Sequence, residues 1–255
     1  MECPPLLKIE LHAHFEVNVT PQILHDVWIR KQQAGCKTSP IDLMREEKYT
    51  DSNTEELVSM ISSFLGDLLT DKESIQYALR KVLVNFFSDS VVYLELRVKP
   101  RRTRDLSAEE YIQIFLDTIK DFEIHVPAMH TQLVLCVNRS HSFAAAKSVV
   151  SLASRLRADE GPGVVGIDFC GDPTVRIYGE ISMLTPAFEQ AAENGLGITT
   201  GDAGVFGIPL PTEYRLVAQH FNFTSDQMRH LARQGIEAIF GGEKEKQRLR
   251  KVFFK

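Results

Sequence analysis

Two histidines near the start of the chain are the clearest candidates for chemistry. His12 and His14 flank Ala13 at the end of an apolar run over residues 6–11. Side chains two residues apart on a strand point to the same side, so both imidazoles converge at the C-terminal end of that strand. Imidazole is a common zinc ligand, and the pair therefore predicts a metal site. A hydrogen-bonded structural pair is the alternative, because short motifs also occur without a function.

A basic segment over residues 97–104 is the second candidate. Its basic residues are Arg97, Lys99, Arg101, Arg102 and Arg104. Guanidinium groups match the oxygens of a phosphate in a bidentate way, so the segment predicts a phosphate clamp. A solvated loop is the alternative, since a run of charges is usually exposed.

The elements that would position these residues alternate between β-rich and helical segments. Strands are expected at residues 6–11, 91–96, 133–137, 164–169 and 196–199, and helices at 21–33, 54–69, 72–87, 108–122, 143–157 and 179–193. This alternation is the pattern of βα units around a parallel sheet. Three further helices are expected at 211–221, 225–240 and 243–253. The last of them is expected to be a solvated surface helix because it carries many alternating charges.

The predicted fold class is α/β. Since eight βα units need roughly 250 residues, about five to six units with extra C-terminal helices predict an incomplete (β/α)8 TIM barrel. An open doubly wound sheet fits the same pattern. We expect one domain over residues 1–255, because the chain is short enough for a single α/β core.

In either fold, ligands gather at the C-terminal ends of the parallel strands. The side chains expected there are His12, His14 and Glu16, then the basic segment, then Asn138, Arg139 and His141, then Asp168 and Gly171, and finally Asp202. Gly171 begins a turn, and its missing side chain would also let a flat ligand approach the backbone.

Composition restricts the partners. The formal net charge of -5 and the pI near 5.9 argue against a nucleic acid or a membrane surface as partner. No apolar stretch reaches the roughly 20 residues that span a bilayer. The 4 cysteines form no Cys-x-x-Cys pair, and Cys136 and Cys170 lie in apolar segments where a free thiol behaves as a small hydrophobe. We therefore expect a cytoplasmic protein with reduced cysteines.

Four motifs occur in order along the chain. They are Leu11-His12-Ala13-His14, Tyr93-Leu94-Glu95-Leu96-Arg97 leading to Pro100-Arg101-Arg102, Val165-Gly166-Ile167-Asp168-Phe169-Cys170-Gly171-Asp172-Pro173, and Gly201-Asp202-Ala203-Gly204-Val205-Phe206. Together they resemble the adenosine and AMP deaminase family, and are most similar to the adenosine deaminase-like branch that removes methylamine from N6-methyl-AMP.

The resemblance implies a metal-dependent hydrolase of purine catabolism. In that family a zinc ion activates the water that attacks C6 of the purine, and a glutamate carries protons. The implied partner is a purine nucleoside or nucleoside monophosphate, and the implied cofactor is one Zn²⁺. Carried over residue by residue, the metal ligands are His12, His14 and Asp202. The substrate-binding residues are His14, Glu16, Arg101, Arg102, Asn138, Gly171 and Asp202.

The chain departs from the family after Thr200. A His-x-x-Glu segment that supplies a further zinc ligand and the proton-carrying glutamate is expected there, but Gly201 and Asp202 follow directly. We therefore expect an internal deletion near residues 200–201 and assign no catalytic residue. Because a shift of one residue on a strand turns a side chain to the other face, Asp202 need not replace the ligand expected at Gly201.

Two hypotheses about activity follow. The chain is either a purine deaminase or a catalytically inactive truncated homologue that retains at most weak metal or nucleotide binding. The same residues also allow a makeshift metal site of His12, His14 and His141 or Asp202, with Glu16 as the base. Missing strands would expose two sheet edges, so self-association is also expected.

Overall fold

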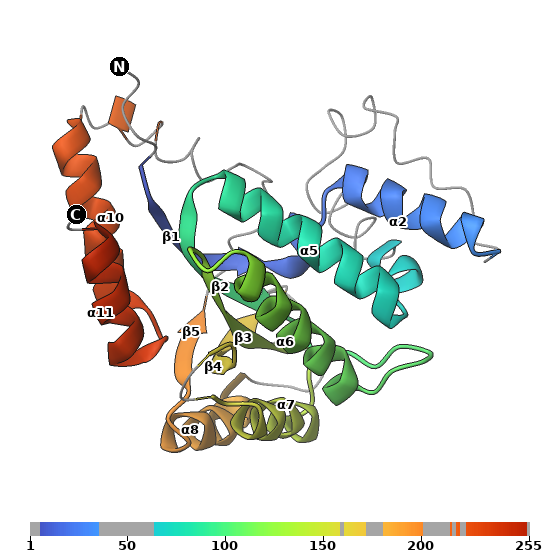
Figure 1. Cartoon of the computed structure of the whole chain (residues 1–255). Coiled ribbons are helices and arrows are strands. Elements are labelled where there is room, and N and C mark those ends of the chain that lie inside the picture. Colours follow the sequence, from blue (N-terminus) through green and yellow to red (C-terminus); the bar gives the residue numbers. More distant parts are fainter. Residues whose placement is uncertain are drawn as a thin grey trace.

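One sheet of parallel strands forms the centre of the molecule (Figure 1). The computed structural model describes residues 6–35, 64–158, 161–171, 181–200, 215, 218–219 and 223–253. The strands are β1 (Lys8–His14), β2 (Val91–Val98), β3 (His130–Asn138), β4 (Val164–Cys170) and β5 (Gly197–Thr200), and they lie side by side in chain order. A doubly wound sheet would reverse its strand order at a switch point. The α/β prediction is therefore confirmed as part of a barrel, and the doubly wound alternative is wrong.

Helices connect the strands and cover one face of the sheet (Figure 1). The helices in the described residues are α1 (Phe15–Asn18), α2 (Pro21–Gln33), α5 (Lys72–Ser88), α6 (Ala108–His125), α7 (Phe143–Arg155), η1 (Ile181–Leu184), α8 (Thr185–Glu193), α10 (Ser225–Ala238) and α11 (Gly242–Phe253). Apolar side chains of α5, α6, α7 and α8 pack with those of β1 to β4 in one hydrophobic core. Among the described residues, no helix is both long and apolar enough to cross a membrane.

Sequence signals at helix starts agree with the structure. Ser107 accepts a hydrogen bond from the backbone of Glu110, whose side chain accepts one from the backbone of Ser107, so the two residues form a capping box. Thr224 and Gln227 form a second capping box at the start of α10. These local bonds fix where each helix begins, independently of the rest of the fold.

Strand β1 differs from its prediction in a way that concerns the histidines. The apolar run predicts a strand over residues 6–11, but β1 continues to His14, which pairs with Arg97 of β2. Between Glu10 and Ala13 the register shifts, so that β1 contains one residue more than β2. Such a bulge re-aims the neighbouring side chains. His12 and His14 therefore belong to the strand, and the bulge sets the direction of their side chains.

The two C-terminal helices pack against the opposite face of the sheet, which we call the inner face. Their buried residues Ile236, Ile239 and Leu249 form a second core with Ile9 and Tyr93. At the starts of two strands, His130 bonds to Glu245 at 2.9 Å and Arg248 donates to the carbonyl of Val92 at 2.9 Å. The prediction of a solvated surface helix at 243–253 is therefore wrong for one side of α11, because Leu249 is fully buried.

Phe240, between the two helices, packs on the inner face where two glycines lie side by side. Gly166 of β4 and Gly197 of β5 are register partners. A Cβ atom added at Gly197 would lie 2.6 Å from the Phe240 ring, and one added at Gly166 would lie 3.0 Å from it. Both positions require glycine because the ring occupies the space of a side chain. The α10–α11 hairpin thus fills the N-terminal end of the inner face.

We predict that Gly197→Ala destabilises the protein by about 1 to 3 kcal/mol, the usual cost of overpacking. Most of that loss should disappear in a Phe240→Ala background, because the clash then has no partner. Urea unfolding of the two single variants and the double variant measures the coupling between the positions. Gly66→Ala is the control, since a Cβ there meets nothing within 4 Å. Additive effects of Gly197→Ala and Phe240→Ala would contradict the packing described.

A second prediction concerns Glu95, which lies under the hairpin. Its side chain is 2% exposed and accepts hydrogen bonds from the Tyr93 hydroxyl at 2.9 Å and the Phe240 amide at 2.6 Å. Burial raises the pKa of Glu95, while these bonds partly oppose the shift. Because the folded pKa lies above the unfolded value of about 4.3, the stability from the protonated carboxyl is full below that pH and is lost as pH rises.

Glu95→Gln keeps the acceptor oxygen and does not titrate. The variant should therefore gain stability over the unmodified protein as the pH is raised from about 4 through the folded pKa of Glu95, following the linkage between proton binding and unfolding. Unfolding midpoints measured from acid to neutral pH check this result. The exposed Glu109→Gln controls for the loss of one negative charge. A gap that shrinks as the pH rises would refute the predicted sign.

Candidate active site

Three side chains that can bind a metal meet at the C-terminal ends of β1, β3 and β4. Asp168 Oδ2 lies 4.0 Å from His14 Nε2 and 3.7 Å from Cys136 Sγ. Cys136 Sγ lies 3.9 Å from His14 Nδ1. One ligand atom from each residue falls within 4.8 Å of the others, so His14, Cys136 and Asp168 form a compact group with nitrogen, sulfur and oxygen donors.

Strand register brings these residues together. Cys136 and Asp168 are direct partners in the parallel pairing of β3 with β4. Their neighbours Leu135, Val137 and Ile167 point into the core on the helical side, so period-two alternation turns Cys136 and Asp168 to the inner face. Both are buried, at 1% and 0% exposure. Two members of the group are therefore buried side chains of paired central strands.

Arg97 of β2 neutralises the carboxylate of this group. Its Nε donates to Asp168 Oδ1 at 3.3 Å, and its Nη1 donates to the carbonyl of Leu11 in the β1 bulge. The guanidinium is 2% exposed, so the ion pair is almost completely removed from water. One carboxylate oxygen of Asp168 is thus held by Arg97, and the other faces His14 and Cys136.

The surroundings keep His14 neutral. Burial lowers the pKa of His14 to about 3, and the nearby positive charges of His12, Arg97 and Lys99 add to the shift. A neutral imidazole is the form that binds a metal. The hydrogen bond from Cys136 to Cys170 raises the pKa of the Cys136 thiol and lowers that of Cys170. Cys136 is therefore the protonated partner of the two thiols.

The other predicted metal ligands have different positions. The His12 ring lies beside that of His14, with centroids 5.3 Å apart and planes at 50°. His12 as a ligand stays a prediction. Asp202 lies outside the described residues. His141 follows β3, and its Nδ1 accepts from the Asn138 amide at 3.3 Å.

Asn138 and Gly171 lie together at the same end of the sheet. Gly171 has φ +105°, and a Cβ there would lie 2.7 Å from Asn138 Nδ2, so the position requires glycine. Asn138 Oδ1 accepts from the amide and the hydroxyl of Ser140 at 2.8 and 2.6 Å. Glu16, on α1, accepts from the Lys99 amide at 3.3 Å. These polar groups surround the strand ends, and their substrate contacts stay predictions.

The two predicted phosphate contacts differ from each other. Arg101 Nη2 donates to the carbonyls of Leu65 and Leu69 at 3.0 and 2.9 Å, and its guanidinium lies 5.1 Å from the centre of the Tyr111 ring. Arg101 therefore caps the end of the helix at residues 64–68. Arg102 is exposed. Its side chain remains available to a phosphate, whereas Arg101 has a structural role in this conformation.

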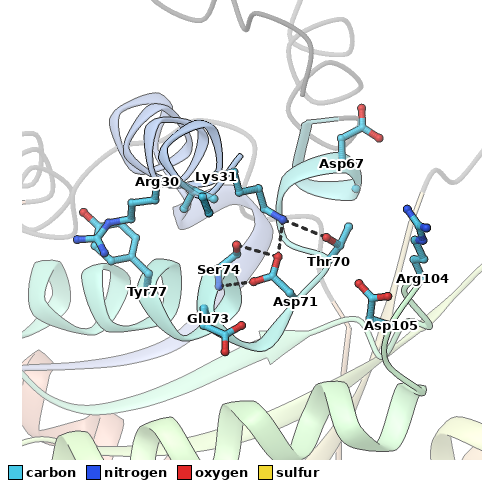
Figure 2. Close-up of a pocket in the computed structure, with 13 residues that line it drawn as sticks. Arg30, Lys31, Asp67, Thr70, Asp71, Glu73, Ser74, Tyr77, Arg104 and Asp105 are labelled. Atoms are coloured by element: carbon cyan, nitrogen blue, oxygen red, sulfur yellow. Dashed lines mark hydrogen bonds and ion pairs between the residues drawn. The ribbon is translucent and has the colours of Figure 1, made fainter. Parts of the chain in front are cut away.

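A pocket of about 860 Å³ lies elsewhere, between α2, residues 66–71 and the start of α5 (Figure 2). Of the residues in the predicted site, only Arg104 of the basic segment lines it. Figure 2 shows Lys31 reaching Asp71 and Thr70 across it, while Asp71 accepts from the Ser74 amide at 2.9 Å as the N-cap of α5. The charged side chains around this pocket hold α2 and α5 together. The residues predicted to bind a metal or the purine ring do not line it.

The sequence does not predict the position of Cys136 beside His14 and Asp168. It predicts a thiol that behaves as a small hydrophobe, because Cys136 lies within an apolar strand. Its position two residues before Asn138 was the available signal, since that spacing puts both side chains on one face. Arg97 and Asp168 were recognised at strand ends, but their pairing across β3 depends on the sheet order.

We predict that Arg97→Met destabilises the protein by about 3 to 5 kcal/mol, because it leaves the buried carboxylate of Asp168 without its partner. Arg155→Met is the matched control, since Arg155 and Glu109 form an ion pair that is 55% and 54% exposed. The control should cost no more than about 1 kcal/mol, as exposed pairs do. Denaturant unfolding compares the two variants, and equal losses would contradict the importance of the buried pair.

The chain is similar in sequence to several deaminases. An adenosine deaminase-like protein of Drosophila melanogaster is 29% identical over 194 residues, which are 75% of this chain and 55% of that protein. The N6-methyl-AMP deaminase of Danio rerio is 29% identical over 193 residues, 75% of this chain and 53% of that protein. The chain thus spans about half the length of these relatives. The human N6-methyl-AMP deaminase is 23% identical over 330 aligned positions, covering 96% of this chain and 92% of that protein.

Solved structures agree on the fold. Arabidopsis ADAL complexed with GMP superposes with a TM-score of 0.80 and 23% identity, covering 97% of this chain and 96% of that one. The adenine deaminase from Arthrobacter aurescens has a TM-score of 0.79 and 14% identity, covering 99% of this chain and 98% of that one. The adenosine deaminase family model matches residues 7–201. Because that match takes in most of the chain, this protein belongs to the adenosine deaminase family.

Proposed function

We propose that this chain hydrolyses the 6-amino or 6-methylamino group of a purine nucleoside or nucleoside monophosphate. The observation that carries the proposal is the group of His14, Cys136 and Asp168 at the strand ends of a chain in the adenosine deaminase family. Relatives named N6-methyl-AMP deaminase favour the methylamino monophosphate as substrate. Arabidopsis ADAL has been solved with GMP and with IMP, which favours a purine monophosphate as ligand.

The donor set fits a divalent metal such as zinc. It combines a neutral imidazole, a thiol and a carboxylate oxygen that faces them both, and three protein ligands leave a fourth position open. When bound, such an ion supplies a Lewis acid for the attack of water on the purine. His14 and Asp168 would hold it, and Arg97 would fix the orientation of Asp168 through the other carboxylate oxygen.

The remaining residues bind the substrate and move its protons in this proposal. Gly171 lets a purine ring approach the backbone because it has no side chain. Asn138, which contacts it, would orient the ring by hydrogen bonding. Glu16 would take a proton from the attacking water and return it to the departing amine. Arg102 would bind the phosphate, since its exposed guanidinium can reach solvent.

A second candidate is a relative that binds a purine nucleotide or a metal without turnover. The sequence passes from Thr200 to Gly201 without a His-x-x-Glu segment. We propose an internal deletion near residues 200–201 of a single domain. Its support is the alignment with the human relative, which needs 330 positions for a chain of 255 residues. Association of copies through open sheet edges belongs to the same proposal.

The test is hydrolysis of N6-methyl-AMP, AMP and adenosine by the purified chain supplied with Zn²⁺. We expect release of methylamine and formation of the 6-oxo purine from N6-methyl-AMP. His14→Ala should lower kcat/KM by at least about 100-fold, the low end for loss of one essential group. His125→Ala is the control, because this exposed histidine ends α6. Arg102→Ala should raise KM for the monophosphates more than for adenosine.

Other outcomes separate the two candidates. Calorimetric binding of IMP without any product from the three substrates would favour the inactive relative. Turnover that His14→Ala leaves unchanged would place the chemistry elsewhere. If the chain binds neither IMP nor a metal and turns over none of the three substrates, both candidates are refuted.

A further inference from the structure

We propose that Cys136 is a metal ligand, so that this chain binds Zn²⁺ through one nitrogen, one thiolate sulfur and one carboxylate oxygen. The ligands are His14, Cys136 and Asp168. This inference deepens the proposed function, since it describes the metal site of that function. It is tested without substrate, so its failure and that of the deaminase are separate results.

The geometry of the three side chains supports the assignment. Bond lengths of about 2.0 to 2.3 Å around a tetrahedral zinc place neighbouring ligand atoms roughly 3.3 to 3.6 Å apart. Asp168 Oδ2 already lies 3.7 Å from Cys136 Sγ and 4.0 Å from His14 Nε2. These two pairs of ligand atoms therefore need to close by only a few tenths of an ångström, and all three ligand atoms lie within 4.8 Å of one another. The parallel pairing of Cys136 with Asp168 supplies that preorganisation.

Charge balance explains why a thiolate is needed. Arg97 already compensates the negative charge of Asp168 through their 3.3 Å contact. A divalent ion bound with neutral donors would therefore add two uncompensated positive charges to a buried site, beside Arg97 and Lys99. When Cys136 binds, its S–H bond breaks, the proton leaves to solvent and a sulfur–zinc bond forms. The net charge then rises by one instead of two.

Burial makes Cys136 a better candidate than a surface thiol. Its side chain is 1% exposed on the inner face, and its Sγ lies 3.9 Å from His14 Nδ1 and 3.7 Å from Asp168 Oδ2. Cys170, two positions after Asp168 on β4, offers the matched comparison, because it is also a buried free thiol. The distinction between these two cysteines is the specific content of the proposal.

The test uses Co²⁺ as a spectroscopic substitute for Zn²⁺ in the full chain. Titration of the metal-free protein should give one equivalent of bound Co²⁺ with a sulfur-to-cobalt charge-transfer band in the near ultraviolet. Cys136→Ser should abolish the band and raise the Kd for Zn²⁺ by about 100-fold or more, beyond the 10- to 100-fold expected for residues outside the ligand shell. Cys170→Ser should keep the band.

A second measurement covers the case in which Cys136→Ser does not fold. X-ray absorption of the unmodified protein with Zn²⁺ should show one sulfur at about 2.3 Å. A shell of nitrogen and oxygen alone at about 2.0 to 2.2 Å would overturn the proposal. So would a charge-transfer band that survives Cys136→Ser and disappears in Cys170→Ser. Binding of no metal by the folded chain would overturn it as well.

Discussion

The buried ion pair of Arg97 and Asp168 sets the arrangement of the inner face. A guanidinium and a carboxylate at 2% and 0% exposure are stable only when each compensates the other. Arg97 also reaches the carbonyl of Leu11, which the β1 bulge turns toward it. The pair therefore joins β1, β2 and β4 at one level of the sheet. At that level, His14 and Cys136 lie beside Oδ2, the second carboxylate oxygen of Asp168.

The opposite end of the same face is closed by apolar packing instead of charge. Phe240 lies over Gly166 and Gly197, and Leu249 is buried against β2. In a complete barrel the remaining strands would enclose this interior. In the part of the chain that the structure describes, the α10–α11 hairpin contributes the cover at the strand starts. The candidate site residues therefore lie at the opposite end of the inner face, at the C-terminal ends of the strands.

Membership of the adenosine deaminase family concerns the fold, whereas the site geometry concerns which side chains meet at the strand ends. The family match covers residues 7–201, which include β1 with its two histidines. The site contains features that the resemblance did not suggest, above all a thiol between His14 and Asp168. Arg101, which the resemblance assigned to a phosphate, bonds to the helix at 64–68. The geometry at the strand ends therefore includes residues that the family pattern alone does not describe.

The sequence by itself determined the α/β class, because the alternation of strand and helix signals depends on local periodicity and caps. Every strand that the structure describes overlaps a predicted one, and the capping box at Ser107 is formed by neighbours in the chain. The sequence leaves the doubly wound alternative open because strand order is a long-range property. Period-two alternation also explains why Cys136 and Asp168 point to the same face of the sheet as His14.

Tertiary structure alone decided which of those side chains meet. The β1 bulge, the register of β3 on β4 and the pairing of Arg97 with Asp168 arise from contacts between segments far apart in the chain. The same holds for α11, whose charged sequence predicts exposure although Leu249 is buried by the sheet. Local patterns specify the direction of a side chain within its own element. Its partners depend on how the elements pack, because register and burial are properties of the whole fold.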